Sequence, residues 1–151
     1  MTRTDLCWAL GVFVAGGIII SATMPLMGLL GLQTTERGVR RLAEFSAGMR
    51  VAMVLTAGVT EEIRYRGYLV ERLYQLTGRL GLSAALSWLA FLVVHIPSWT
   101  LGGAIQIGLA SVVLYLLYVK RRNLPACMLA HILNHIVALF VVPALLPRAS
   151  P

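Results

Sequence analysis

The sequence predicts an all-α, polytopic transmembrane bundle with about five membrane helices and one short amphipathic helix at the membrane interface. Of the 151 residues, 58% are hydrophobic and only 13% are charged, a balance that excludes an ordinary soluble domain. The apolar residues form long runs, and most charged residues occupy the short segments between those runs. The net charge of +7 is therefore explained by basic residues in the loops between membrane helices. We expect the chain to contact the lipid bilayer and no nucleic acid.

The first membrane helix is predicted within residues 6–35, which contain no charged side chain. This run is long enough to cross a bilayer, and we expect the helix to end near Pro25–Gly31. Residues 33–50 then form a polar connector with four arginines. Three apolar side chains in the connector have the spacing of a short amphipathic helix at the interface: Leu42, Phe45 and Met49.

The second membrane helix is expected to carry charges inside the membrane. It begins near residues 45–50 and runs through the apolar segment 51–59 directly into Glu61 and Glu62. So short an apolar run cannot cross a hydrocarbon core of about 30 Å at 1.5 Å per residue. The helix must therefore continue past both carboxylates, to about Leu76.

The remaining apolar residues predict three further spans. Residues 80–119 contain no Asp, Glu, Lys or Arg, and at roughly 60 Å of helix they form two spans, with turn signals at 96–98 and 102–103. Residues 123–147 form the last span, with Pro125 in its first turn. With five crossings, eight of the 13 Lys and Arg residues lie on the side of the N-terminus, which predicts a cytoplasmic N-terminus.

The two adjacent carboxylates are predicted to have different roles. Glu62 and Arg66 are four residues apart on one helix face, with the acid first, which is the better order for an ion pair. Glu61 lies about 100° away around the helix and remains available as a proton acceptor. The alternative is that these charges only mark a helix end at the lipid headgroups.

All three histidines lie in apolar segments of membrane length. His95 is predicted roughly 21 Å and His131 roughly 12 Å from the same membrane surface, and Glu61 enters from the opposite side to a similar level. The three side chains are therefore expected to meet. A proton acceptor together with imidazole donors is what hydrolysis of a peptide bond inside a membrane requires, although intramembrane histidines can also serve only as hydrogen bonds between helices.

Three ordered motifs carry a resemblance to a known family. EEIRYR, with Glu61, Glu62 and Arg66, matches EExxxR; FLVVH, with Phe91 and His95, matches FxxxH; HILNH, which begins at His131, approximates HxxxN. Over about residues 45–147 the chain thus resembles the CPBP family of intramembrane proteases, also called the CAAX-protease or Abi family.

The resemblance implies an intramembrane glutamic-type endopeptidase. Glu61 would activate a water molecule, His95 would assist it, and His131 would donate a hydrogen bond to the oxyanion. Glu62 and Arg66 would form a supporting pair, and Phe91 would pack beside His95.

The third motif departs from the family pattern. His135 stands four residues after His131, where the family usually has Asn, and Asn134 stands at the third residue. Positions three and four residues away are both neighbours on a helix, so either side chain could supply the second donor.

The same departure keeps a zinc-dependent alternative open. His131 and His135 have the spacing of two zinc ligands on one helix, and His95 with Glu61 could complete the coordination. The glutamate of an HExxH motif is missing, because Ile132 occupies its position. We therefore expect no cofactor, with zinc as the alternative.

Two non-proteolytic functions remain open, a membrane immunity or interaction protein and a metal or proton transporter. For the protease, the expected substrate is a membrane protein or a lipidated peptide, and the expected location is the bacterial plasma membrane. We treat residues 1–151 as one membrane domain, in which residues 1–44 are the anchor helix and connector and residues 45–147 are the catalytic core.

Overall fold

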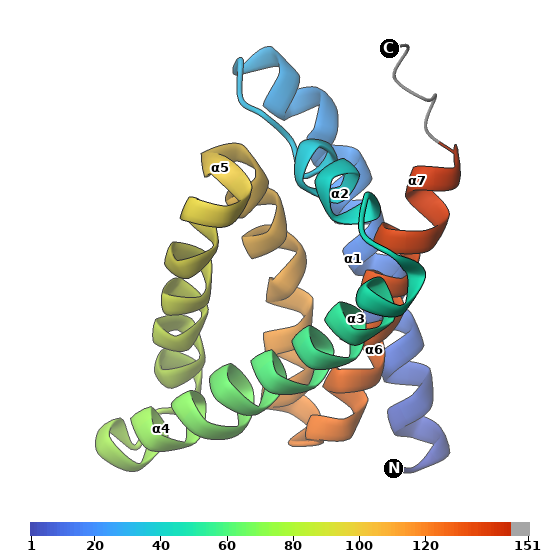
Figure 1. The fold of residues 1–151 in the computed structure, drawn as a ribbon. Coiled ribbons are helices and arrows are strands. Elements are labelled where there is room, and N and C mark those ends of the chain that lie inside the picture. The colour runs from blue at the N-terminus through green and yellow to red at the C-terminus, as the bar shows by residue number, and fades with distance from the viewer. Residues whose placement is uncertain (146–151) are drawn as a thin grey trace, which may run out of the picture.

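The computed structural model describes residues 1–145 as helices joined by short turns, with no strand in that range (Figure 1). Helix α1 (Arg3–Leu29) starts at a capping box, in which Thr2 and Asp5 bind each other's backbone and side-chain atoms. It is followed by Gly31 in the left-handed region, at φ 65°. A short helix, α2 (Glu36–Ala43), is present in the predicted connector. Of the three apolar residues that predicted it only Leu42 lies in α2, because Phe45 follows it and Met49 belongs to the next helix. The predicted end of the core at residue 147 lies outside the described residues.

A continuous helix crosses the bundle and carries both adjacent carboxylates. Helix α3 (Ala47–Glu61) leads without a break into the π-helical segment η1 (Glu62–Val70) and then into α4 (Glu71–Thr77). Gly78, with φ 64°, ends it. The predicted continuation past Glu61 to about Leu76 is confirmed. The wider π-helical turns start directly after Glu61, and such segments are frequent at functional sites.

Helix α5 (Leu80–Arg121) consists of two arms that meet at Thr100, where the backbone leaves helical geometry at φ 64° and ψ 170°. Figure 1 shows the second arm returning alongside the first. The two predicted spans are therefore present, and the break lies between the two turn signals in the sequence. The chain then continues through α6 (Leu124–Ile136), η2 (Val137–Val141) and α7 (Val142–Leu145).

Three of these helical segments are long and apolar enough to cross a membrane: Arg3–Leu29, Leu80–Arg121 and Leu124–Leu145. Large apolar side chains such as Ile18, Leu55 and Val93 are about half exposed on the outside of the bundle, as expected for contact with lipid. The chain is an integral membrane protein.

Buried polar contacts fix the relative positions of the helices. The amide of Gln106, which is fully buried, accepts a hydrogen bond from the backbone N–H of Thr35 and donates to the carbonyl of Ile20 and the hydroxyl of Thr23. Gln106 thereby joins the second arm of α5 to α1 and to the connector.

Two ion pairs close one end of the bundle. Arg121 binds Asp5 at 2.8 Å, and Arg122 binds Glu71 at 2.6 Å. The N-terminus, α4 and the turn between α5 and α6 therefore lie at the same end (Figure 1), which is the arrangement that the five-crossing topology predicts.

Candidate active site

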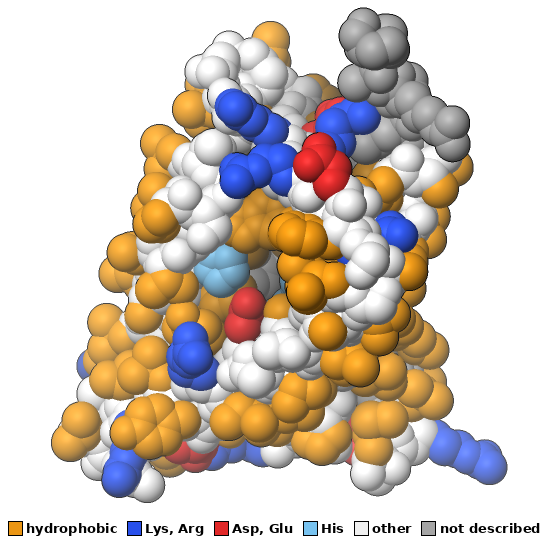
Figure 2. Space-filling model, in the orientation of Figure 1, with side chains coloured by type: hydrophobic (Ala, Val, Ile, Leu, Met, Phe, Trp, Pro, Cys, Tyr) orange, Lys and Arg blue, Asp and Glu red, His pale blue; other side chains and the backbone are white. Residues whose placement is uncertain are grey.

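Three helices bring one carboxylate and two imidazoles together near the middle of the bundle. Glu61 Oε2, at the end of α3, lies 3.9 Å from His95 Nε2 on the first arm of α5 and 3.9 Å from His131 Nε2 on α6. The side chains are partly accessible, with exposed fractions of 25% for Glu61, 13% for His95 and 9% for His131. Figure 2 shows a hollow on one face of the molecule with a histidine and an acidic side chain at its edge.

The gap between Glu61 and His95 has the size of one bridging water molecule. A separation of 3.9 Å is too long for a direct hydrogen bond, but a water can bridge two polar groups at this distance. His95 Nδ1 donates to the carbonyl of Phe91 at 2.7 Å, because a carbonyl can only accept. In the neutral ring Nε2 then carries the lone pair, so a bridging water can donate one hydrogen to Glu61 and one to His95.

Glu62 is buried, and one of its two carboxylate oxygens accepts two hydrogen bonds. Its Oε1 accepts hydrogen bonds from Arg66 Nη1 at 2.8 Å and from His131 Nδ1 at 2.7 Å, and both Glu62 and Arg66 have no exposed surface. The predicted i,i+4 pair is therefore present. A buried carboxylate with a guanidinium partner is held in one position, which leaves Glu61 as the accessible carboxylate of the two.

Aromatic rings surround the buried guanidinium. Arg66 lies 4.0 Å from the ring centroid of Tyr115 and 5.0 Å from that of Phe91, and Phe91 also stacks against His95 at 4.2 Å. Rings at these distances attract a cation through their π faces. Phe91 thus packs beside His95, as the resemblance implied.

Sequence reasoning missed the supporting contacts of Tyr115. The hydroxyl of Ser87 donates to the carbonyl of Tyr65 at 2.8 Å and lies 3.2 Å from the Tyr115 hydroxyl. The available signal was weak, since it consisted only of hydroxyl side chains inside apolar runs. These contacts attach η1 to both arms of α5 and so fix the helix that carries Glu61.

His131 and His135 form a coupled pair on α6. Their Nε2 atoms lie 2.8 Å apart, so one nitrogen must carry a proton and the other a lone pair. His131 already donates from Nδ1 to the carboxylate of Glu62. In the neutral pair, His131 Nε2 therefore accepts and His135 Nε2 donates.

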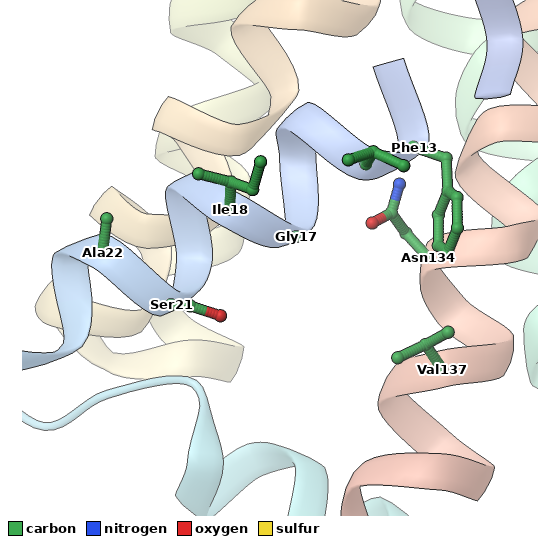
Figure 3. Close-up of a pocket in the computed structure, with 8 residues that line it drawn as sticks. Phe13, Gly17, Ile18, Ser21, Ala22, Asn134 and Val137 are labelled. Carbon is green, nitrogen blue, oxygen red and sulfur yellow. The ribbon is translucent and has the colours of Figure 1, made fainter. Parts of the chain in front are cut away.

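Asn134 lies on a different side of the same helix. Its side chain lines a groove of about 630 Å³ between α1 and α6, together with Phe13, Gly17 and Val137 (Figure 3). Its amide nitrogen donates to the carbonyl of Ala130. Of the two residues that the sequence left open, the structure brings His135 to His131 and directs Asn134 towards α1.

The placement of these side chains does not fit a zinc ion. Two imidazole nitrogens on tetrahedral zinc, each about 2.0–2.1 Å from the metal, would be about 3.3 Å apart, whereas the Nε2 atoms of His131 and His135 are 2.8 Å apart. Within residues 1–145 there is no group of three or more His, Cys, Asp or Glu side chains placed to hold a metal ion.

Fold and site together define a class, namely polytopic helical membrane proteins with an acid and imidazoles grouped inside the bundle. The model of the Rce1-like family, described as type II CAAX prenyl endopeptidase Rce1-like, matches residues 43–137. The chain therefore belongs to this family of intramembrane proteases, as the three motifs predicted. No curated protein and no solved structure matches the chain.

Proposed function

We propose that this protein is an intramembrane endopeptidase that hydrolyses a peptide bond of a membrane-associated protein with a water molecule activated by Glu61, without a metal ion. One observation carries the proposal. Glu61 Oε2 lies 3.9 Å from two imidazole nitrogens in an accessible position, while the adjacent Glu62 is buried and paired.

In the proposed reaction, water bound between Glu61 and His95 transfers a proton to the Glu61 carboxylate as its oxygen attacks the carbonyl carbon of the substrate. The carbonyl oxygen becomes an oxyanion, and the Nε2 hydrogen of His135, which binds His131 Nε2 in the resting pair, turns to the oxyanion and donates to it. Glu61 then returns the proton to the amide nitrogen, the C–N bond breaks, and a carboxylic acid and an amine leave. His95 keeps the water in place through its Nε2 lone pair.

Glu62 and Arg66 are proposed to have a positioning role. The Glu62 carboxylate accepts a hydrogen bond from His131 Nδ1–H, which fixes the tautomer and the orientation of that ring. Phe91 has a related role for His95, because its carbonyl accepts a hydrogen bond from His95 Nδ1–H and its ring packs on the imidazole.

The proposed substrate is a membrane protein or a lipidated peptide. The family name points to prenylated CAAX tails, and a bundle of membrane helices gives such a lipid chain an apolar surface beside the site. The proposed location is a bacterial plasma membrane, which rests on the family resemblance. The distribution of Lys and Arg supports an N-terminus in the cytoplasm.

Cleavage of a farnesylated CAAX peptide by the purified protein in lipid nanodiscs tests the proposal. Glu61→Gln should lower the rate by about 10³-fold, and His95→Ala and His131→Ala by about 10²-fold each, in the ranges for general bases and oxyanion donors. Glu36→Gln, in an exposed pair on α2, is the control and should retain the wild-type rate. Full activity of Glu61→Gln would refute the assigned roles.

The same assay with a zinc chelator tests the metal-free mechanism. We expect the rate to remain unchanged after incubation with 1,10-phenanthroline and after addition of zinc. A loss that zinc restores would favour the zinc-dependent alternative with His95, His131, His135 and Glu61 as ligands.

A further inference from the structure

A groove of about 430 Å³ lies on the outside of the bundle, between α1 and the second arm of α5. Its lining is apolar along most of its length, where Cys7, Gly11 and Ala15 of α1 lie beside Val113 and Leu116 of α5. A Cβ atom at Gly11 would meet nothing within 4 Å, so the missing side chain leaves the groove open. The groove shares no lining residue with the one in Figure 3, and none with the candidate active site.

One end of this groove is positively charged. Lys120 lines that end and is exposed, and its ammonium lies 5.8 Å from the ring centroid of Trp8. The next two residues, Arg121 and Arg122, each bind a carboxylate. Within residues 1–145 Lys120 has no carboxylate partner, so its charge is available to an anion from outside the chain.

The groove has the length of one lipid leaflet. Lys120 follows the apolar run of α5, and Trp8 is exposed beside it, a combination that is typical of the headgroup level of a membrane. From Thr4, at the same end of the groove, to Ala15, α1 rises about 16 Å. Since the hydrocarbon core is about 30 Å thick, the groove runs from the headgroups to the middle of the bilayer.

We propose that this groove binds one anionic phospholipid, with the headgroup phosphate at Lys120 and one acyl chain along Gly11. Basic pockets between membrane helices are typical sites for anionic headgroups. The hydroxyl of Thr4, which also lines the groove, can donate a hydrogen bond to the phosphate. The site is remote from Glu61 in the chain and in its lining residues, so it does not depend on the proposed protease function.

Lipid titration of the purified full chain in detergent, followed by native mass spectrometry, tests the charged end. The probes are phosphatidylglycerol and phosphatidylcholine with the same acyl chains. We expect the wild type to bind phosphatidylglycerol about 5-fold more tightly, the size of the effect of one basic residue at an anionic headgroup. Lys120→Gln should bind both lipids equally. Arg79→Gln, which removes another exposed cation, should keep the preference.

Filling the groove tests its apolar part. Gly11→Leu should weaken the binding of both lipids by about 10-fold, because the acyl chain loses its apolar contacts. Gly17→Leu is the matched control, since a Cβ atom there also meets nothing within 4 Å and the residue lines the other groove. It should bind both lipids as the wild type does.

Alkylation of Cys7 by N-ethylmaleimide locates the bound lipid, because Cys7 lines the groove and is exposed whereas Cys127 is buried. Phosphatidylglycerol should slow this alkylation in the wild type and not in Gly11→Leu. Equal affinity of the wild type for the two lipids, or a preference that survives Lys120→Gln, would overturn the proposal. Protection of Cys7 in a dimer formed without added lipid would also overturn it, since a second copy of the chain would then occupy the groove.

Discussion

Two neighbouring residues of α6, Asn134 and His135, point in different directions because successive residues of a helix lie about 100° apart. A Cβ atom at Gly16 of α1 would lie 3.4 Å from the side-chain amide of Asn134, so that amide fills the contact with α1. His135 lies one residue further around the helix and reaches His131. Sequence spacing could not decide between the two, because the position of α1 depends on contacts distant in the chain.

At this residue scale, His135→Asn should keep kcat/KM within about 10-fold of wild type, because an Asn amide can also donate to the oxyanion. His135→Ala should lose about 10²-fold, since it removes the donor. Asn134→Ala is the matched control and should stay within about 2-fold. A loss in Asn134→Ala as large as that in His135→Ala would contradict the assignment.

At the scale of elements, the contact between α3 and α6 determines how close Glu61 comes to His131. A Cβ atom at Gly58 would lie 2.4 Å from Ile132 Cγ1 and 3.3 Å from the Ile132 backbone nitrogen, so only glycine allows this approach. The sequence predicted the helix through Glu61 from length alone. It could not predict the π-helical turns of η1, because these depend on packing against α5 and α6.

Gly58→Ala should therefore push α3 away from α6 and lower kcat/KM by about 10²-fold, the effect expected when reacting groups move by about 1 Å. Gly17→Ala in α1, where an added Cβ meets nothing within 4 Å, should leave kcat/KM unchanged. The comparison requires that both variants remain folded by circular dichroism. Wild-type kcat/KM in folded Gly58→Ala would show that the close approach is not needed.

The break in α5 stores strain at one residue. Thr100 has φ 64° and ψ 170°, a region that is populated essentially by glycine. The sequence predicted a turn here from Pro97 and Gly102–Gly103, but the strained residue is neither a proline nor a glycine, so propensity alone could not locate it.

Thr100→Gly should raise the free energy of unfolding by about 1 kcal/mol, because it relieves this strain. Ser98→Gly, at a neighbouring position with helical backbone angles, should lower it by a similar amount. Thermal unfolding in detergent measures both. A decrease in both variants would argue against strain at Thr100.

At the scale of the whole molecule, charge distribution and fold agree on which segments share a side of the membrane. The ion pairs Asp5–Arg121 and Glu71–Arg122 hold the N-terminus, α4 and the turn between α5 and α6 at one end. The sequence predicted this grouping because apolar runs of membrane length alternate with basic segments. Which compartment that end faces depends on the cell, not on contacts within the chain.

We expect the end with the N-terminus to face the cytoplasm. A single cysteine at Arg79, introduced with Cys7 and Cys127 replaced by serine, should react with a membrane-impermeant maleimide only in inverted vesicles. A cysteine at Arg37, on the opposite end, should react in intact cells. The reverse pattern would invert the proposed orientation.

The hydrogen bonds of the Gln106 amide could hold the protein together if it were made as two separate polypeptides. It joins the second arm of α5, inside the matched segment 43–137, to α1 and the connector outside that segment. Membrane helices insert individually before they associate, and the chain between α2 and α3 is a short exposed turn. Two separate polypeptides, residues 1–44 and 45–151, should therefore find each other in the bilayer and reassemble, whereas the longer one alone would leave the Gln106 amide unpaired in lipid.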